Sequence, residues 1–403
     1  MIDPSLVPFS SLELQPQEEM LAVGRKKGKL SIGMPKETCM QEKRVALTPD
    51  GVHLLINNGH EVSIETGVGH GARYTDKDYS EVGAKIVYSA KEAFQCDIVL
   101  KIEPPSDEEI AYMTSKQTLF SALQLKTRSK SFFEELIKKK STAIAVEYIH
   151  DSKGQYPIQQ CMGEIAGSTS VLIASEYLSN ANEGKGYVMG GITGVPPTEI
   201  VILGAGTVGL YAARTALGLG ASVKVFDRSV SRIKRLLQEL DRPIYTAVIQ
   251  PKLLSKALKR CDVVIGALRP ENGRTPVVVD EAMVQQMKPK SVMIDVSIDN
   301  GGCFETSELT SHEDPTYEKY DIIHYCVPNI ASRVARTASF SLNNIFAPLL
   351  LKIGEEGGID NALRYMPELR AGMYMSSGLI THRYLGERYD LPFTEGNLLF
   401  GEL

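Results

Sequence analysis

A glycine-rich segment at residues 200–209 limits the possible folds of this chain more than any other. Its sequence, IVILGAGTVG, places a GxGxxG pattern directly after an apolar run, and residues 210–216 are typical of a helix. In a dinucleotide-binding fold the first glycine permits a tight turn, the second lets the backbone approach a pyrophosphate, and the third allows close helix–strand packing. The helix N-terminus adds N–H groups and partial positive charge. We predict a Rossmann-type domain that binds this cofactor through Gly204, Gly206, Thr207, Val208 and Gly209.

The choice of dinucleotide is predicted by Asp227. It ends the apolar run at residues 222–227, eighteen residues after Gly209. A carboxylate there can accept hydrogen bonds from both hydroxyls of the adenosine ribose and would repel a 2′-phosphate. NAD is therefore favoured over NADP, a preference that the neighbouring Arg228 weakens slightly.

Short apolar runs alternate with helical segments on both sides of this motif. Before the motif, strands are expected at residues 29–34, 61–65, 85–88, 97–102, 119–122 and 142–147. From the motif onward, strands are expected at residues 198–203, 222–227, 262–266 and 291–296. Long helices are expected at residues 162–178 and 335–351, and the tail after them shows no strand pattern. The alternation is typical of βαβ units in mostly parallel sheets.

We predict an α/β protein with two Rossmann-like doubly wound domains, joined by long helices and separated by a cleft that holds the ligand site. Residues 30–160 and 340–403 are expected to form a substrate (catalytic) domain, onto which the tail packs back. Residues 161–339 are expected to form the NAD-binding domain, and residues 1–29 an N-terminal extension.

Composition excludes several classes of function. The formal net charge of −5 argues against a nucleic-acid binder or an anionic-membrane binder, because both need a dense basic face. The six cysteines are scattered without a CxxC pair, so we expect neither a disulfide framework nor a metal site. No stretch approaches the roughly 20 apolar residues of a membrane span, and the N-terminus has no signal-peptide pattern. We expect a soluble, cytoplasmic protein.

Several motifs, in the same order, resemble those of the alanine dehydrogenase family, which shares its fold with the NAD-binding subunit of proton-translocating transhydrogenase. The matching segments are GMPKET (33–38), EKRVALTP (42–49), NGHEV (58–62), MGEIAG (162–167), IDNGGCFE (298–305), YCVPN (325–329) and PFTE (392–395). The resemblance covers about residues 31–395. It implies reversible, NAD-dependent oxidative deamination of L-alanine to pyruvate and ammonia by a homo-oligomer, either a hexamer or a dimer.

The resemblance also implies site residues. Arg44 takes the place of the family arginine that binds the substrate carboxylate, a task that suits a guanidinium with two parallel N–H donors. Asp299 matches the family aspartate beside the nicotinamide and the substrate, and Asn329 matches the nicotinamide-side asparagine. Three alternatives stay open: a surface role for Arg44, and turn-forming roles for Asp299 and Asn329.

Two positions depart from the family pattern. The family has a Lys-x-Lys-Glu-Pro run, whereas this chain has KIEPP at residues 101–105, so Glu103 stands at the catalytic lysine's position. Lys101 lies two residues earlier, and strand alternation would place it on the same face, either reaching the pocket or paired with Glu103. Gln124 stands at the position of the family histidine. A glutamine can hydrogen-bond the substrate but cannot carry a proton near neutral pH.

We therefore predict Arg44, Lys101, Gln124 and Asp299 as the catalytic residues, with a small 2-amino or 2-oxo acid as substrate and no metal. None of the seven histidines is an obvious substitute for the missing one, and His324 is expected to be a satisfied core histidine. Another 2-amino acid or a secondary amine is an alternative substrate, and Glu103 could select a cationic group. A transhydrogenase-like subunit and an NAD-binding sensor without turnover are the remaining alternatives.

Overall fold

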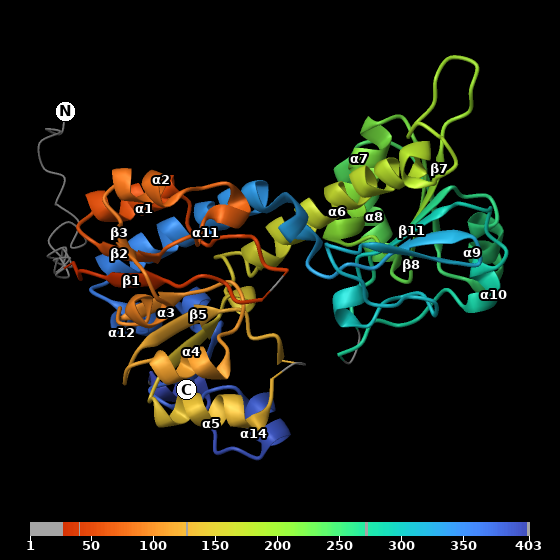
Figure 1. Ribbon diagram of the computed structural model, residues 1–403. Coiled ribbons are helices and arrows are strands. Elements are labelled where there is room, and N and C mark those ends of the chain that lie inside the picture. The colour runs from red at the N-terminus through yellow and green to blue at the C-terminus, as the bar shows by residue number, and fades with distance from the viewer. Residues whose placement is uncertain (1–26, 40, 126–127, 271–272, 401–403) are drawn as a thin grey trace, which may run out of the picture.

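The computed structural model describes residues 27–39, 41–125, 128–270 and 273–400 (Figure 1). The described chain forms two lobes, each with a largely parallel sheet between layers of helices. Two long helices, α6 (Pro157–Leu178) and α11 (Ala335–Glu355), run between the lobes. The predicted α/β class with two Rossmann-like domains is confirmed. Most of the predicted N-terminal extension lies outside the described residues.

The first sheet has the strand order β15-β14-β6-β5-β4-β1-β2-β3. Its strands are β1 (Ser31–Met34), β2 (Glu61–Glu65), β3 (Lys85–Val87), β4 (Ile98–Leu100), β5 (Thr118–Ser121), β6 (Thr142–Ala145), β14 (Met373–Ser376) and β15 (Leu379–Ile380). Strands β1 to β6 pair in parallel, whereas β14 pairs antiparallel with β6 and with β15. The tail therefore packs onto the first lobe as expected, but the prediction that it lacks strands is wrong.

The helices of the first lobe are α1 (Pro49–Asn57), α2 (Asp76–Glu81), α3 (Ala90–Ala93), α4 (Asp107–Tyr112), α5 (Lys130–Lys138), α12 (Ile359–Tyr365), α13 (Pro367–Arg370), α14 (Arg383–Tyr389) and α15 (Gly396–Leu399). The first five of them begin at residues that suit a helix N-terminus. Helix α1 starts with a proline in its first turn, where a missing N–H costs nothing. Helix α4 has a reciprocal capping box between Ser106 and Glu109.

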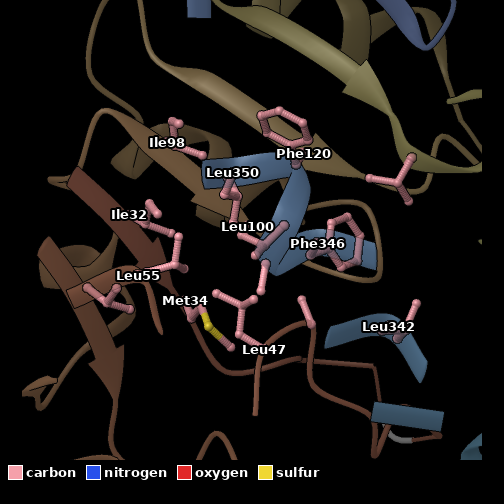
Figure 2. Packing of buried hydrophobic residues seen from close by; sticks show 14 of the residues in the cluster. Ile32, Met34, Leu47, Leu55, Ile98, Leu100, Phe120, Leu342, Phe346 and Leu350 are labelled. Carbon is pink, nitrogen blue, oxygen red and sulfur yellow. The ribbon is translucent and has the colours of Figure 1, made fainter. Parts of the chain in front are cut away.

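The core of this lobe forms where α11 crosses the sheet. Leu342, Phe346 and Leu350 lie four residues apart on α11, so they share one helix face, and none is more than 2% exposed. Figure 2 shows them beside Ile32 and Leu100 from the sheet. Burying each of these side chains contributes roughly 1.5–3 kcal/mol, which fixes α11 on the first lobe.

The second sheet has the strand order β12-β13-β11-β10-β7-β8-β9. Its strands are β7 (Glu199–Leu203), β8 (Ser222–Asp227), β9 (Tyr245–Val248), β10 (Val263–Gly266), β11 (Val292–Asp295), β12 (Thr316–Lys319) and β13 (Ile322–Tyr325), and its helices are α7 (Thr207–Gly218), α8 (Val230–Leu240), α9 (Pro251–Leu258) and α10 (Glu281–Val284). All neighbours pair in parallel except β12 with β13. After β7 the chain adds β8 and β9 on one side and then returns to β10 on the other. This reversal of strand order creates the crevice in which doubly wound sheets bind ligands.

Residues 160 and 340, at which we divided the chain, lie inside α6 and α11. Within the described part of the chain, no helix is long and apolar enough to span a membrane.

Candidate active site

A cavity of about 1480 Å³ lies between the two lobes. The first lobe lines it with Arg44, Glu103, Gln124 and Glu147, which follow β1, β4, β5 and β6. The second lobe lines it with Val208 from α7 and with Asp299 and Asn329, which follow β11 and β13. Because the carboxyl ends of parallel strands meet at one edge of a sheet, both sheets present their polar loops to the same space.

Arg44 lies at the wall of this cavity, held by a neighbour in the sequence. Its Nη2 and Nε donate to the two carboxylate oxygens of Glu42, at 2.5 and 2.8 Å, and its side chain is only 10% exposed. Burial alone would lower the pKa of Arg44 and raise that of Glu42, but their mutual attraction outweighs burial and reverses both shifts. Arg44 Nη1 contacts the weak acceptor Sδ of Met162 at 3.2 Å. The surface role left open for Arg44 does not fit this burial.

Asn329 joins the two lobes at the site. Its Nδ2 donates to Glu42 Oε2 at 2.8 Å, and its backbone N–H donates to Asp299 Oδ1 at 3.1 Å. The backbone of Asn329 is left-handed, with φ of 53°, so the turn-forming role and the contact with the site coexist.

A buried aspartate four residues before Asp299 shapes the loop that carries it. The carboxylate of Asp295 accepts from the backbone N–H groups of Ser297 and Cys303, each at 2.9 Å, and closes the loop across Gly301 and Gly302. Both glycines have positive φ values, 97° and 75°, which other residues rarely adopt. The turn-closing role considered for Asp299 thus belongs to Asp295, and Asp299 is left to line the cavity.

The two positions that depart from the family pattern contact each other. Gln124 Nε2 donates to Glu103 Oε2, and Glu103 Oε1 lies 3.9 Å from Arg44 Nη2. The Gln124 backbone has φ of 45°, a conformation that is uncommon for a residue other than glycine. Burial and repulsion by Glu42 raise the pKa of Glu103 to about 7, against the attraction of Arg44.

Lys101 is not brought together with these residues. Its side chain is 0% exposed, does not line the cavity, and forms ion pairs with Glu109 at 2.7 Å and Glu37 at 3.4 Å. Burial alone would lower the pKa of Lys101, but attraction by the two carboxylates outweighs burial and raises it. Lys101 therefore neither lines the cavity nor pairs with Glu103, the two alternatives considered for it, because its charge is already balanced by Glu37 and Glu109.

Replacing this lysine tests whether it supports the fold. We expect Lys101→Met to lower the free energy of unfolding by about 3–5 kcal/mol, because two buried carboxylates lose their cation. The matched control is Lys138→Met, which breaks an exposed ion pair with Glu135 and should cost less than about 1 kcal/mol. Urea unfolding at pH 8 measures both values. A Lys101→Met protein with wild-type stability but no turnover would instead assign Lys101 to the chemistry.

The glycine motif has the geometry that a dinucleotide requires. Gly204 has φ of 117°, and a Cβ there would lie 2.3 Å from the carbonyl oxygen of Ala267. A Cβ at Gly209 would lie 1.9 Å from the carbonyl oxygen of Gly204, so helix and strand touch at that point. A Cβ at Gly206 would meet no atom within 4 Å, so open space lies at the N-terminus of α7. Thr207 and Val208 form the first turn of that helix, where N–H groups lack helical partners. An NAD pyrophosphate fits such a position.

Asp227 lies at the end of β8, next to this motif, and is 2% exposed. Its Oδ2 accepts from the N–H of Ala205 and its Oδ1 from the N–H of Ser229, both at 2.7 Å. The carboxylate therefore fixes the glycine turn against β8. Because each carboxylate oxygen has two lone pairs, Asp227 retains the capacity to accept from ribose hydroxyls.

His324 is buried and hydrogen-bonded, as expected of a core histidine. Its ring nitrogens lie 2.9 Å from Thr306 Oγ1 and 2.9 Å from the carbonyl oxygen of Ile322. Among the residues that the structure describes, no group of three or more His, Cys, Asp or Glu side chains could hold a metal ion.

Comparison with known proteins identifies the family. The family model described as Alanine dehydrogenase/PNT, N-terminal domain, matches residues 33–166, and the corresponding C-terminal domain matches residues 170–383. The chain belongs to the alanine dehydrogenase/PNT family. An alanine dehydrogenase from Mycolicibacterium smegmatis is 37% identical over 365 residues, which cover 90% of this chain and 98% of that protein. One from Methanococcus maripaludis is 37% identical over 92% of this chain and 100% of that protein.

A solved L-alanine dehydrogenase has the same fold as this member of the alanine dehydrogenase/PNT family. The two structures superimpose with a TM-score of 0.83 at 36% identity, covering 89% of this chain and 99% of the other. The overall fold is therefore shared along nearly the full length of both chains.

Two further carboxylates of the site were not predicted: Glu42, which holds Arg44, and Glu147, which lines the cavity. Glu42 stands two residues before Arg44, and that spacing in an extended segment could have indicated the ion pair. Glu147 follows β6 and accepts from the N–H of Leu123 at 2.8 Å, so it holds the loop before Gln124. No local pattern marks it, because its partner lies 24 residues away.

Proposed function

We propose that this chain is an NAD-dependent amino-acid dehydrogenase that catalyses the reversible oxidative deamination of L-alanine to pyruvate and ammonia. The observation that carries the proposal is the arrangement of Arg44, Asp299 and Asn329 at one cavity, beside the N-terminal turn of α7. Family membership supports it, because the relatives that match over about nine-tenths of the chain are alanine dehydrogenases. We further propose that the enzyme acts as a homo-oligomer in the cytoplasm.

Arg44 would anchor the substrate carboxylate. Its Nε and Nη2 donate to Glu42, whereas among the described residues the hydrogen-bond contact of Nη1 is with the sulfur of Met162. A carboxylate is a far stronger acceptor than a thioether, so a substrate would displace that contact and gain a charge-assisted hydrogen bond. Glu42 thereby fixes the direction in which the guanidinium points.

Asp299 would handle protons and water as the amine becomes an imine and then a ketone. Bound NAD supplies the hydride acceptor. Asn329 donates from its backbone N–H to Asp299 Oδ1 at 3.1 Å, which holds the carboxylate at the cavity that it lines. In this position Asp299 can orient the water that attacks the imine carbon, or accept a proton from it.

The direct test is formation of NADH from NAD with L-alanine, and its consumption with pyruvate and ammonia. We expect turnover with NAD to exceed turnover with NADP at least tenfold, because the Asp227 carboxylate repels a 2′-phosphate. A panel of other 2-amino acids and secondary amines defines the range of substrates. Tight NAD binding without turnover on any member of the panel would contradict the dehydrogenase and favour a sensor.

A further inference from the structure

A carboxyl group occupies the place in the cavity where the family has its catalytic lysine. We propose that Glu103 is the acid–base group that exchanges a proton with the oxygen on the C2 atom of the substrate, and that Gln124 is its positioning residue. The inference rests on the proposed function, and it names which group carries the proton in a site that lacks both the lysine and the histidine.

The contacts of Glu103 are those of a proton-carrying group. Its side chain lines the cavity and is 15% exposed, so a small substrate can reach it. One carboxylate oxygen accepts from the amide of Gln124, which fixes the rotation of the carboxyl. The carboxylate of Glu42 is close enough to repel the ionised form of Glu103. Two carboxyl groups that repel each other in this way favour a proton on one of them.

Charge decides which of the two carboxyls holds that proton. Glu42 accepts three hydrogen bonds from Arg44, one of them from its backbone N–H, and one from Asn329, and these stabilise its ionised form. Glu103 accepts from the neutral amide of Gln124, and its contact with Arg44 is more distant, at 3.9 Å. The proton therefore resides on Glu103.

Other carboxylates act on Glu103 in the same direction. Glu37 accepts from the backbone N–H of Glu103 at 3.4 Å and repels its ionised form. Glu147 and Asp299, which line the same cavity, add further negative charge. Lys101, two residues before Glu103, is paired with Glu109 and Glu37. Burial, together with repulsion by the neighbouring carboxylates and against the attraction of Arg44, raises the pKa of Glu103 to about 7, close to the range in which an acid–base group works best.

The proton transfers balance in both directions. In amination, the lone pair of ammonia forms the N–C2 bond, and the π electrons of the C2=O bond move to oxygen, which takes the proton of Glu103. The new –NH3+ group then releases one proton to solvent to give the neutral carbinolamine. In deamination, the oxygen of water bonds to the carbon of the protonated imine, and the π electrons of the C=N bond move to nitrogen, which becomes a neutral amino group. The water proton passes to the ionised Glu103. Amination thus needs the protonated carboxyl and deamination the carboxylate.

The first experiment measures kcat/KM against pH for alanine and for pyruvate, in the wild type and in Glu103→Gln, which keeps the size of the side chain. We expect the wild-type amination rate to fall, and the deamination rate to rise, as the pH passes through about 7. Glu103→Gln should lower kcat/KM about 10²- to 10⁴-fold and remove both pH limbs. Glu103→Asp keeps a titrating group and should recover part of the rate together with a pH limb.

The second experiment measures the protonation of Glu103 directly, in protein that is not turning over substrate. In protein labelled with ¹³C at the glutamate carboxyl groups and free of NAD, the resonance that is absent from Glu103→Gln should titrate near pH 7, rather than near the ordinary 4.5. Glu135→Gln, on the exposed face of α5, is the matched control and should leave the resonance that titrates near pH 7 in place.

The outcomes separate the inference from the proposed function. A wild type without turnover on any substrate overturns the proposed function, and the inference with it. If the Glu103→Gln variant keeps both its turnover and the pH dependence of its rate, the inference is overturned but the proposed function is not. The inference is also overturned if Glu103→Gln only raises KM for amino acids with a second cationic group, because Glu103 would then recognise substrate charge.

Discussion

Arg44→Lys should lower kcat/KM for L-alanine and pyruvate by about 30- to 1,000-fold, or about 2–4 kcal/mol, with little loss of stability. A lysine keeps the positive charge that neutralises Glu42, so no buried carboxylate is left unpaired. It lacks the planar fork, however, and a single ammonium cannot bind Glu42 through two parallel bonds while directing a third N–H at the substrate. The fall should appear mainly in KM, because the carboxylate is bound before the chemical step.

The matched control for Arg44→Lys is Arg336→Lys. Arg336 is on α11 and donates to the backbone carbonyl of Arg73 at 2.9 Å, outside the cavity. Steady-state kinetics and thermal unfolding of both variants should show a kinetic defect in the first and none in the second. A kcat/KM within threefold of wild type in Arg44→Lys would show that the substrate carboxylate is bound elsewhere.

Gly206→Ala should weaken NAD binding by about 10- to 100-fold and leave the fold of the protein without NAD unchanged. The added Cβ meets no protein atom within 4 Å, so nothing in the folded chain resists it. It would occupy the space at the N-terminus of α7 through which a pyrophosphate must approach the backbone. A steric conflict of this size typically costs about 1–3 kcal/mol.

Two other glycines serve as controls for Gly206→Ala. Gly218, at the end of the same helix, has open space around its Cα, so Gly218→Ala should change neither NAD affinity nor stability. Gly209→Ala should instead destabilise the protein itself, because its Cβ would collide with the carbonyl oxygen of Gly204. Calorimetric titration with NAD and thermal unfolding measure these effects. Wild-type affinity in Gly206→Ala would mean that the cofactor does not approach this turn.

The strands of both sheets could be predicted where they are buried and apolar, because burial on both faces leaves a continuous hydrophobic run. Strands β14 and β15 could not be predicted in this way. They contain four and two residues and are joined by a left-handed turn at Ser377 and Gly378. Strand β14 pairs with the edge of β6, and β15 pairs only with β14. A strand that depends on a partner more than 200 residues earlier has no local signal.

Site residues that belong to a sequence motif could be predicted, but those whose side-chain directions depend on tertiary contacts could not. Lys101 and Glu103 were placed on one face by strand alternation, yet β4 ends at Leu100. Beyond that residue the period-2 rule no longer applies. Lys101 is directed into the lobe toward Glu109, while Glu103 lines the cavity. The sequence indicates which residues replace the family lysine and histidine, and the fold shows that they touch.

Strands β14 and β15, the last to join the first sheet, determine when that sheet can be completed during synthesis of the chain. Every strand of the second sheet lies between residues 199 and 325, so that lobe has all its strands well before translation ends. The first sheet has to wait for residues 373–380 to leave the ribosome, and until then the edge of β6 carries unpaired backbone groups. A chain that ends before residue 373 would therefore contain a complete second sheet and an incomplete first sheet. The unpaired edge of β6 would then favour aggregation, and chains in this state are expected to need chaperones.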